Sequence, residues 1–208
     1  MGRPKEHNDD TRAALRAAAE RIVAAAGPGA LSVRAVADQA RTTTRAVYSL
    51  FGSKDGLIDM LAQRAFEFLY TEIEALPETD DPVADLIDLA IKVFRRLALS
   101  HPALYRIAFQ RVAPDLRAGP ELTAARQRAF AQLQRKIGRV DDAGLLGRTS
   151  RRDATIAFEA MMEGLANAEL RGRTLTILPA GKEKQAWRKA LVTLLQGFRA
   201  GEHTERAR

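Results

Sequence analysis

Apolar residues recur at the spacing of an amphipathic α-helix along nearly the whole chain. The first run lies on one face of a helix that we expect to begin near Thr11: Leu15, Ala18, Ala19, Ile22 and Val23. A Gly-Pro-Gly sequence over residues 27–29 is typical of a helix end. The pattern therefore predicts that the chain opens with a long helix and a sharp stop.

Two short helices are predicted next, over residues 33–40 and 44–51. Ser32 and Thr43 precede them and are suited to cap their first turns, because a hydroxyl oxygen accepts from free backbone N–H groups there. With Val36, Val47 and Phe51 facing inward, the pair has the proportions of a helix-turn-helix. The second helix would then point polar side chains outward: Thr44, Arg45, Tyr48 and Ser49. An ordinary three-helix corner with a solvated face is the alternative.

The remainder of the chain is also predicted to be helical. The expected helices cover residues 56–75, 82–100, 102–110, 120–140, 150–170 and 182–200. Residues 175–178 are interpreted as a lone short strand or, preferably, as a loop on the core. No succession of strands is recognised, so the sequence predicts an all-α fold.

The composition limits the kinds of functional site that the chain can form. The chain has 208 residues, no cysteine and three histidines, so disulfides and thiolate ligands are excluded and no metal site is expected. The net charge is +7, with the excess of Lys and Arg in residues 1–56 and 101–208, a balance that suits a polyanion or a solvated surface equally well. No apolar run approaches the roughly 18 residues of a membrane span, and we expect a cytoplasmic protein with no membrane partner.

Residues 31–58 read LSVRAVADQARTTTRAVYSLFGSKDGLI, and this stretch resembles the DNA-binding domain of TetR-type transcriptional regulators. The most specific piece is Val47-Tyr48-x-x-Phe51-x-x-Lys54-x-x-Leu57, and the resemblance covers residues 11–60 closely. It implies a helix-turn-helix domain over residues 1–56 and a helical domain over 57–208 that binds a small molecule and dimerises. It also implies the residues that contact DNA: Arg34, Thr43, Thr44, Arg45, Tyr48 and Lys54.

The sequence departs from the family pattern at the turn between the two short helices. Arg41 stands where the family usually has glycine, and a left-handed backbone costs a non-glycine residue about 1 kcal/mol or more. Either the turn differs or a DNA contact by Arg41 offsets the strain, with a solvated side chain as the simplest interpretation. Thr42 follows where valine is common, and we expect it to fill space between the helices. The arm over residues 2–5 either enters a minor groove or is a tail without contacts.

Pocket and interface residues are proposed in the second domain, which the resemblance assigns to ligand binding and dimerisation. Aromatic and methionine side chains are the candidates for the effector pocket, with ordinary core packing as the alternative: Phe94, Tyr105, Phe109, Phe130, Phe158, Met161 and Met162. A slim helix over 150–170 and an apolar stripe on the last helix predict a homodimer interface, with burial inside the monomer as the alternative: Ala157, Gly164, Trp187, Leu191, Leu195 and Phe198.

Three functions follow from these patterns. The first is a homodimeric transcriptional regulator, usually a repressor, which binds a near-palindromic double-stranded operator and is released by a small-molecule effector. The second is an all-helical enzyme that uses clustered carboxylates: Asp80, Asp81, Asp85 and Asp88. The third is a helical adaptor that binds protein. Because no phosphate-cradling glycine loop, Glu-x-x-His pair or nucleophile motif is present, we expect no enzyme activity and no cofactor.

Overall fold

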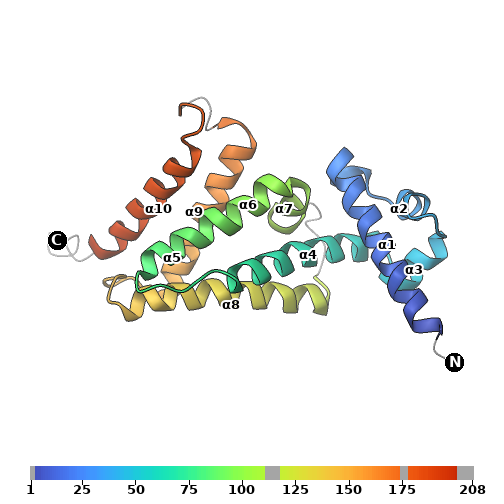
Figure 1. Cartoon of the computed structure of the whole chain (residues 1–208), viewed down its shortest axis with the longest axis horizontal. Helices are drawn as coiled ribbons and strands as arrows, with labels where there is room; N and C mark the ends of the chain where they lie inside the picture. Colours follow the sequence, from blue (N-terminus) through green and yellow to red (C-terminus); the bar gives the residue numbers. More distant parts are fainter. Residues whose placement is uncertain (1–2, 111–117, 174–177, 201–208) are drawn as a thin grey trace, which may run out of the picture. The chain divides into compact units, whose positions relative to one another are not determined.

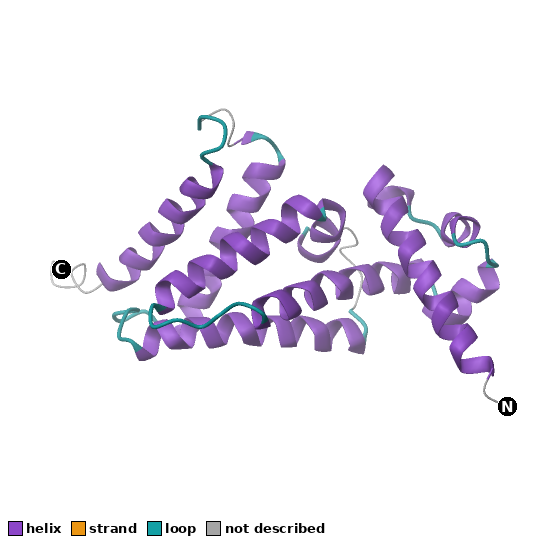
Figure 2. Ribbon diagram, viewed as in Figure 1, coloured by secondary structure: helices purple, strands orange, loops and turns teal. Residues whose placement is uncertain are grey.

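The computed structural model describes residues 3–110, 118–173 and 178–200, with side chains from residue 9 onward. Within these ranges every regular element is a helix and none is a strand (Figure 2). The chain divides into two compact units, which are described separately. Unit 1 contains Met1–Phe68 and His101–Arg126, and unit 2 contains Leu69–Ser100 and Gln127–Arg208. The all-α prediction is confirmed, whereas the domain boundary at residue 56 stays a prediction.

Helix α1 (Arg3–Ala26) opens unit 1 and begins earlier than the predicted Thr11. Pro4 falls in its first turn, where a missing N–H costs nothing because that group has no partner within the helix. The helix ends at Gly27, whose φ is 78°, and a single 3₁₀ turn follows (η1, Pro28–Ala30). The predicted glycine-rich stop is confirmed.

The two short helices form where the sequence predicts them, as α2 (Val33–Gln39) and α3 (Thr44–Phe51) (Figure 1). Ser32 Oγ accepts from the Ala35 amide at 3.1 Å, and Thr43 Oγ1 accepts from the Ala46 amide at 3.2 Å. Both predicted caps are therefore present.

Packing holds these short helices, which would be marginal alone. Val36 of α2 and Val47 of α3 are completely buried, and both helices contact α1, whose Leu15 is also completely buried. Phe51 at the end of α3 is half-buried. The apolar positions therefore fix α2 and α3 from inside and leave the outer side of α3 polar.

Helix α4 (Lys54–Glu74) begins two residues before the predicted Gly56, because Ser53 Oγ accepts from the Gly56 amide at 3.1 Å and caps it. Gly56 lies so close to α3 that an added Cβ would be 1.8 Å from the Phe51 carbonyl oxygen. Only glycine fits this junction between α3 and α4.

Helix α7 (Pro102–Phe109) and the first turns of α8 (Pro120–Asp142) complete unit 1.

After the last turns of α4, unit 2 continues with one helical stretch, as predicted for residues 82–100, but its middle is a π-helix. The segments are α5 (Pro82–Asp88), the π segment Leu89–Phe94 and α6 (Arg95–Ser100). Asp81 caps the stretch, since its Oδ1 accepts from the amides of Val83 at 3.1 Å and Ala84 at 2.9 Å. The π segment is an insertion that apolar periodicity alone does not reveal.

Helices α9 (Arg151–Leu170) and α10 (Glu183–Ala200) complete unit 2 and match the predicted ranges within a residue. Glu169 of α9 joins three helices of this unit: it accepts from Arg95 Nε at 2.8 Å and from Trp187 Nε1 at 2.9 Å, and pairs a second time with the Arg95 guanidinium. The predicted short strand or loop over 175–178 lies largely outside the described residues.

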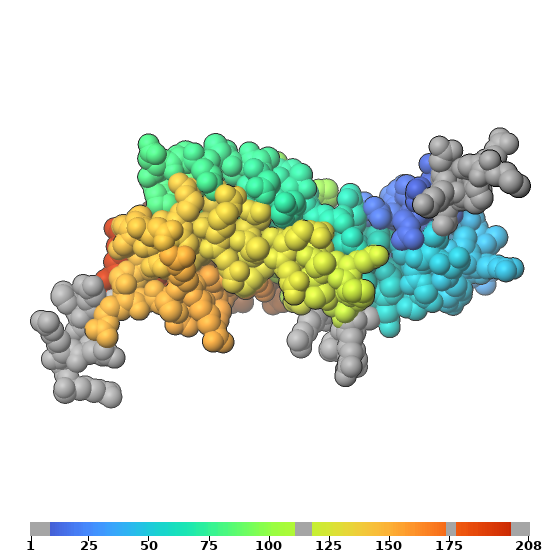
Figure 3. All heavy atoms as spheres, turned by 90° about the horizontal axis from the view of Figure 1, so that it is seen from below, coloured from blue at the N-terminus to red at the C-terminus, as the bar shows by residue number. Residues whose placement is uncertain are grey.

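A second polar cluster links α8 to the start of α5. In Figure 3 the yellow surface of α8 adjoins the green surface of the α5–α6 stretch. Buried Asp85 pairs with Arg139 and accepts from the Thr79 hydroxyl at 2.8 Å and amide at 2.9 Å. Burial alone would raise the pKa of Asp85, but these hydrogen bonds from Thr79 and Arg139 outweigh it and hold the pKa below its ordinary value.

Candidate nucleic-acid interface

The outer side of α3 is exposed over its whole length. Thr44, Arg45 and Ser49 are all exposed, and Tyr48 exposes 55% of its surface. In the described part of the chain, the exposed large hydrophobic residues are Tyr48, Leu99 and Ile156, and Tyr48 is the most exposed of them. An aromatic ring with a polar tip, held in solvent beside hydroxyls and a guanidinium, suits contact with phosphates and base edges.

Thr43 occupies the N-terminal end of this face and has a structural task besides its predicted role. Its Oγ1 accepts from the Ala46 amide, which leaves the hydroxyl proton free to donate to an outside acceptor such as a phosphate oxygen. The free N–H groups and the positive dipole of the first turn of α3 favour an anion at the same end. Phosphate contact is therefore the role that its geometry permits.

Two further predicted contacts flank α3 and are exposed. Arg34 on α2 lies 4.0 Å from Asp38, with their side chains 89% and 74% exposed, so this ion pair is weak and easily exchanged for a phosphate. Lys54 is the first residue of α4 and is exposed. All six predicted DNA-contact residues thus lie on the surface of unit 1, on α2, on α3 or at their ends.

Arg41 adopts the left-handed backbone that the family pattern requires, with φ of 54°. It is the one non-glycine residue with positive φ among those the structure describes. The Arg41 amide donates to the Asp38 carbonyl at 3.1 Å and the Thr42 amide to the Ala37 carbonyl at 3.0 Å, which is the Schellman end of a helix. The turn therefore keeps the shape that glycine would give it, with the strain accepted, and the Arg41 side chain is exposed three residues before α3 begins.

The predicted pocket residues divide between the two units. Tyr105 and Phe109 lie in unit 1, where their rings stack at 5.2 Å and Phe66 meets Phe109 at 5.4 Å. The others lie in unit 2, buried or half-buried: Phe94, Phe130, Phe158, Met161 and Met162. Their role in binding an effector stays a prediction.

The predicted dimer residues differ in exposure. The four apolar side chains of α10 are buried: Trp187, Leu191, Leu195 and Phe198. On α9, Ala157 is half-buried and Gly164 is exposed. The sequence reasoning missed Ile156, which is 53% exposed. The sequence pattern that could have indicated Ile156 is its four-residue spacing to the small residues Ala160 and Gly164, which places all three on one face of α9. Contact with a second copy stays a prediction for the whole set.

Three of the four aspartates considered for an enzyme have structural tasks. Asp81 caps α5, Asp85 is held by Thr79 and Arg139, and Asp88 pairs with Lys92 at 2.8 Å. Among the described residues, no group of three or more His, Asp or Glu side chains is placed to hold a metal ion. In that same part of the chain, no helix is long and apolar enough to cross a membrane.

Two family models match the chain, one in its N-terminal part and one in its C-terminal part. Residues 15–61 match the family model described as bacterial regulatory proteins, tetR family. Residues 87–194, about half of the chain, match the model described as tetracyclin repressor-like, C-terminal domain. None of the curated proteins matches the chain.

Solved structures show the same fold. A protein of unknown function from Rhodococcus sp. RHA1 aligns with a TM-score of 0.75 at 23% identity, covering 90% of this chain and 94% of its own. The TetR family regulator PfmR from Thermus thermophilus aligns at 0.62 and 19%, covering 88% and 97%. RolR, solved with its ligand resorcinol, aligns at 0.64 and 15%, covering 94% and 95%. These likenesses are evidence for the fold.

Proposed function

Because this chain belongs to the TetR family of bacterial regulatory proteins, we propose that it is a transcriptional repressor that binds a near-palindromic DNA operator as a homodimer. The observation that carries the proposal is the outer side of α3, where Thr44, Arg45 and Tyr48 stand exposed above a buried packing surface. On this proposal the protein acts in the cytoplasm, where its DNA lies, and has no catalytic task.

Each residue of the interface would do different work. Arg45 is the long forked donor that can span O6 and N7 of a guanine, so it would read sequence. Thr43, Thr44, Tyr48 and Lys54 would fix the register of α3 through phosphates. Arg34 would do the same from α2, exchanging its weak contact with Asp38 for the DNA backbone.

Symmetry sets the form of the operator. In a homodimer two copies of α3 would enter successive major grooves roughly 34–36 Å apart, so the half-sites would be inverted repeats. We assign the two-fold interface to α9 and to the outer side of α10, since the apolar stripe of α10 is buried within the single chain. The exposed side of α9, with Ile156 and the small Gly164, would let a second helix approach closely.

A small molecule bound in unit 2 would release the operator. The buried aromatic and methionine side chains of the π segment and α9, such as Phe94, Phe158 and Met162, would provide apolar walls for it. That RolR, of similar fold, is solved with resorcinol supports an effector of small size. The effector would act by preferring a dimer whose α3 helices are wrongly spaced, and its effect equals its difference in affinity for the two states.

Selection of bound duplexes from a random library by the purified chain tests this function. We expect an inverted-repeat consensus, and then measure affinity for it by fluorescence anisotropy at one fixed salt concentration. Arg45→Ala is expected to lose about 1–3 kcal/mol, roughly 5- to 150-fold in affinity. Tyr48→Phe, which removes only the hydroxyl, is expected to weaken binding less.

Arg128→Ala is the matched control, since it removes one exposed guanidinium from α8, outside the predicted DNA contacts and the assigned interface. It should leave affinity nearly unchanged. Selection without any consensus, or equal affinity of the wild-type chain, Arg45→Ala and Tyr48→Phe, would contradict the proposed function. DNA affinity that falls steeply as the salt concentration rises is expected for the proposed function and is not expected for a protein-binding adaptor.

A further inference from the structure

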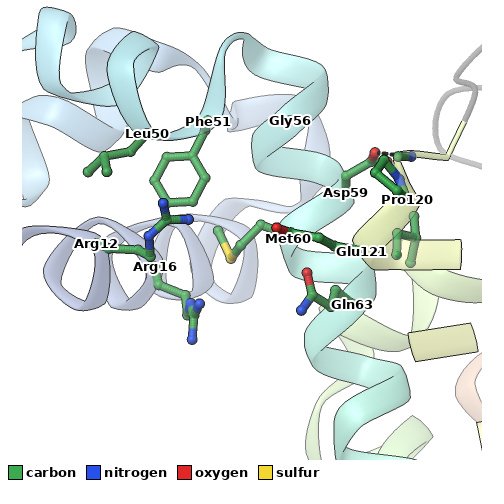
Figure 4. A pocket seen from close by; sticks show the side chains of 12 residues that line it. Arg12, Arg16, Leu50, Phe51, Gly56, Asp59, Met60, Gln63, Pro120 and Glu121 are labelled. Carbon is green, nitrogen blue, oxygen red and sulfur yellow. Dashed lines mark hydrogen bonds between the residues drawn. The ribbon is translucent and has the colours of Figure 1, made fainter. Parts of the chain in front are cut away.

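Unit 1 contains a cavity of 280 Å³ that lies outside both the DNA-contacting face of α3 and the predicted effector pocket (Figure 4). Its walls come from α1, the last turn of α3, the first half of α4 and the start of α8. None of the seven predicted pocket residues lines it. Its volume is near the small end for ligand cavities, about 300–1,000 Å³, which suits one substituted ring.

The α1 wall is cationic. Arg12 and Arg16 lie one helical turn apart, and Figure 4 shows the Arg12 side chain next to the Phe51 ring. The Arg12 guanidinium is 5.6 Å from the centre of that ring. Neither arginine forms an ion pair with any residue in the described part of the chain. Arg16 Nε is buried and has no hydrogen-bond partner among these residues. A donor of this kind is normally paired, because burial removes it from water.

The opposite wall offers an acceptor. Asp59 on α4 holds the Gly119 amide through Oδ2 at 2.8 Å, which fixes its carboxylate against the start of α8. Its other oxygen, Oδ1, is buried and has no partner among the described residues. Glu121 adds a second negative charge on this side of the cavity. One wall of the cavity therefore carries an unpaired donor, Arg16 Nε, together with the Arg12 guanidinium, and the other wall carries an unpaired acceptor, Asp59 Oδ1.

Apolar side chains lie between the charged walls. Met60 is 7% exposed and Leu122 is 8% exposed, and Leu50 and Phe51 of α3 are half-buried. This arrangement matches a molecule with an apolar body, an anionic group at one end and an N–H or O–H donor at the other. A dianion is disfavoured, since its second charge would face Asp59 and Glu121.

We propose that this cavity between α1, α3, α4 and α8 binds a small aromatic monocarboxylate that carries a hydrogen-bond donor. The carboxylate is bound by Arg12 and Arg16, the donor is bound by Asp59 Oδ1, and the ring lies against Met60 and Phe51. The site goes beyond the proposed function, and the test below uses no DNA, so its failure leaves that function untouched.

The methionines provide the assay. The chain has four, of which Met60 lines the cavity, while Met161 and Met162 belong to the predicted effector pocket. With ¹³C-methyl-labelled methionine, titration with 4-aminobenzoate should move the Met60 methyl resonance saturably and leave those of Met161 and Met162 in place. 4-Aminobenzamide, which lacks the charge, and terephthalate, which replaces the donor with a second carboxylate, should each bind at least tenfold more weakly.

Two variants test the walls independently. Arg16→Gln and Asp59→Asn should each raise the Kd for 4-aminobenzoate at least tenfold with an unchanged circular dichroism spectrum. Arg21→Gln, an exposed arginine of the same helix, is the control and should bind as the wild-type chain does. A Met60 resonance that stays fixed up to about 10 mM ligand, where a millimolar site would be filled, overturns the proposal. So does binding that survives both wall substitutions, or that moves only Met161 and Met162.

Discussion

Substitutions of Arg41 can separate two effects, the free-energy cost of the left-handed backbone and the contribution of the guanidinium to DNA binding. The residue holds φ of 54°, and a left-handed backbone costs a residue with a Cβ about 1–2 kcal/mol. Arg41→Gly removes this strain, but glycine also gains freedom in the unfolded chain, worth about 0.5–1 kcal/mol. The glycine variant should therefore be more stable than the wild-type chain by a net of about 0.5–1 kcal/mol.

Arg41→Ala is the matched comparison, because it removes the same guanidinium and keeps the strain. For a chain of this length 1 kcal/mol moves the Tm by about 2–4 °C. Thermal unfolding followed by far-ultraviolet circular dichroism should therefore place the glycine variant about 1–4 °C above the alanine variant. An alanine variant that melts at or above the glycine variant would refute the idea that the turn is strained.

DNA binding should respond differently. Both variants lose the same cation beside α3, so we expect equal loss of operator affinity, and a slope of log K against log salt reduced by about 1 if the guanidinium meets a phosphate. If both variants keep the wild-type operator affinity and salt slope, the Arg41 side chain is solvated and does not contact DNA. Wild-type affinity in the glycine variant alone would show that backbone shape, rather than charge, matters for binding.

Two other substitutions test packing and acid stability. Asp85→Asn should cost about 1–3 kcal/mol at pH 7, because it removes the charge that pairs with Arg139 and leaves one oxygen fewer to accept from Thr79 and Arg139. The pKa of Asp85 is lowered in the fold, so its stabilisation is complete above the ordinary value of 3.8 and is lost as pH falls through the lowered pKa; urea unfolding of the variant should show a weaker dependence on pH there. Gly56→Ala should destabilise the chain by about 1–3 kcal/mol, because its Cβ would meet the Phe51 carbonyl oxygen at 1.8 Å. Gly29→Ala, where an added Cβ meets nothing within 4 Å, should have little effect in the same assay, and equal effects would contradict this reasoning.

Local features were predictable from the sequence because they depend on neighbouring residues. The Ser32 and Thr43 caps and the helix end at Gly27 follow from hydroxyl and glycine chemistry within a few positions. The outward residues of α3 follow from helical spacing once Val47 is placed inside. The resemblance to a known family then located the turn at which Arg41 is strained.

Features that depend on distant residues were not predictable from periodicity. Arg95 and Glu169 are separated by 74 residues, and Gly119 and Asp59 by 60, so their hydrogen bonds exist only once the helices have packed. The π segment was equally hidden, since it changes the helical register without changing the apolar content. The cavity in unit 1 is of this kind, because α1 supplies its cations and α4 its acceptor.

The single tryptophan gives the molecule a natural optical label. Trp187 is buried, and its indole N–H is fixed to Glu169 inside unit 2. Its emission therefore reports on one half of the protein, while α1, α2 and α3 contribute none of it. Fluorescence and circular dichroism followed in the same melt would thus show whether the half that meets DNA loosens before the half that carries the indole.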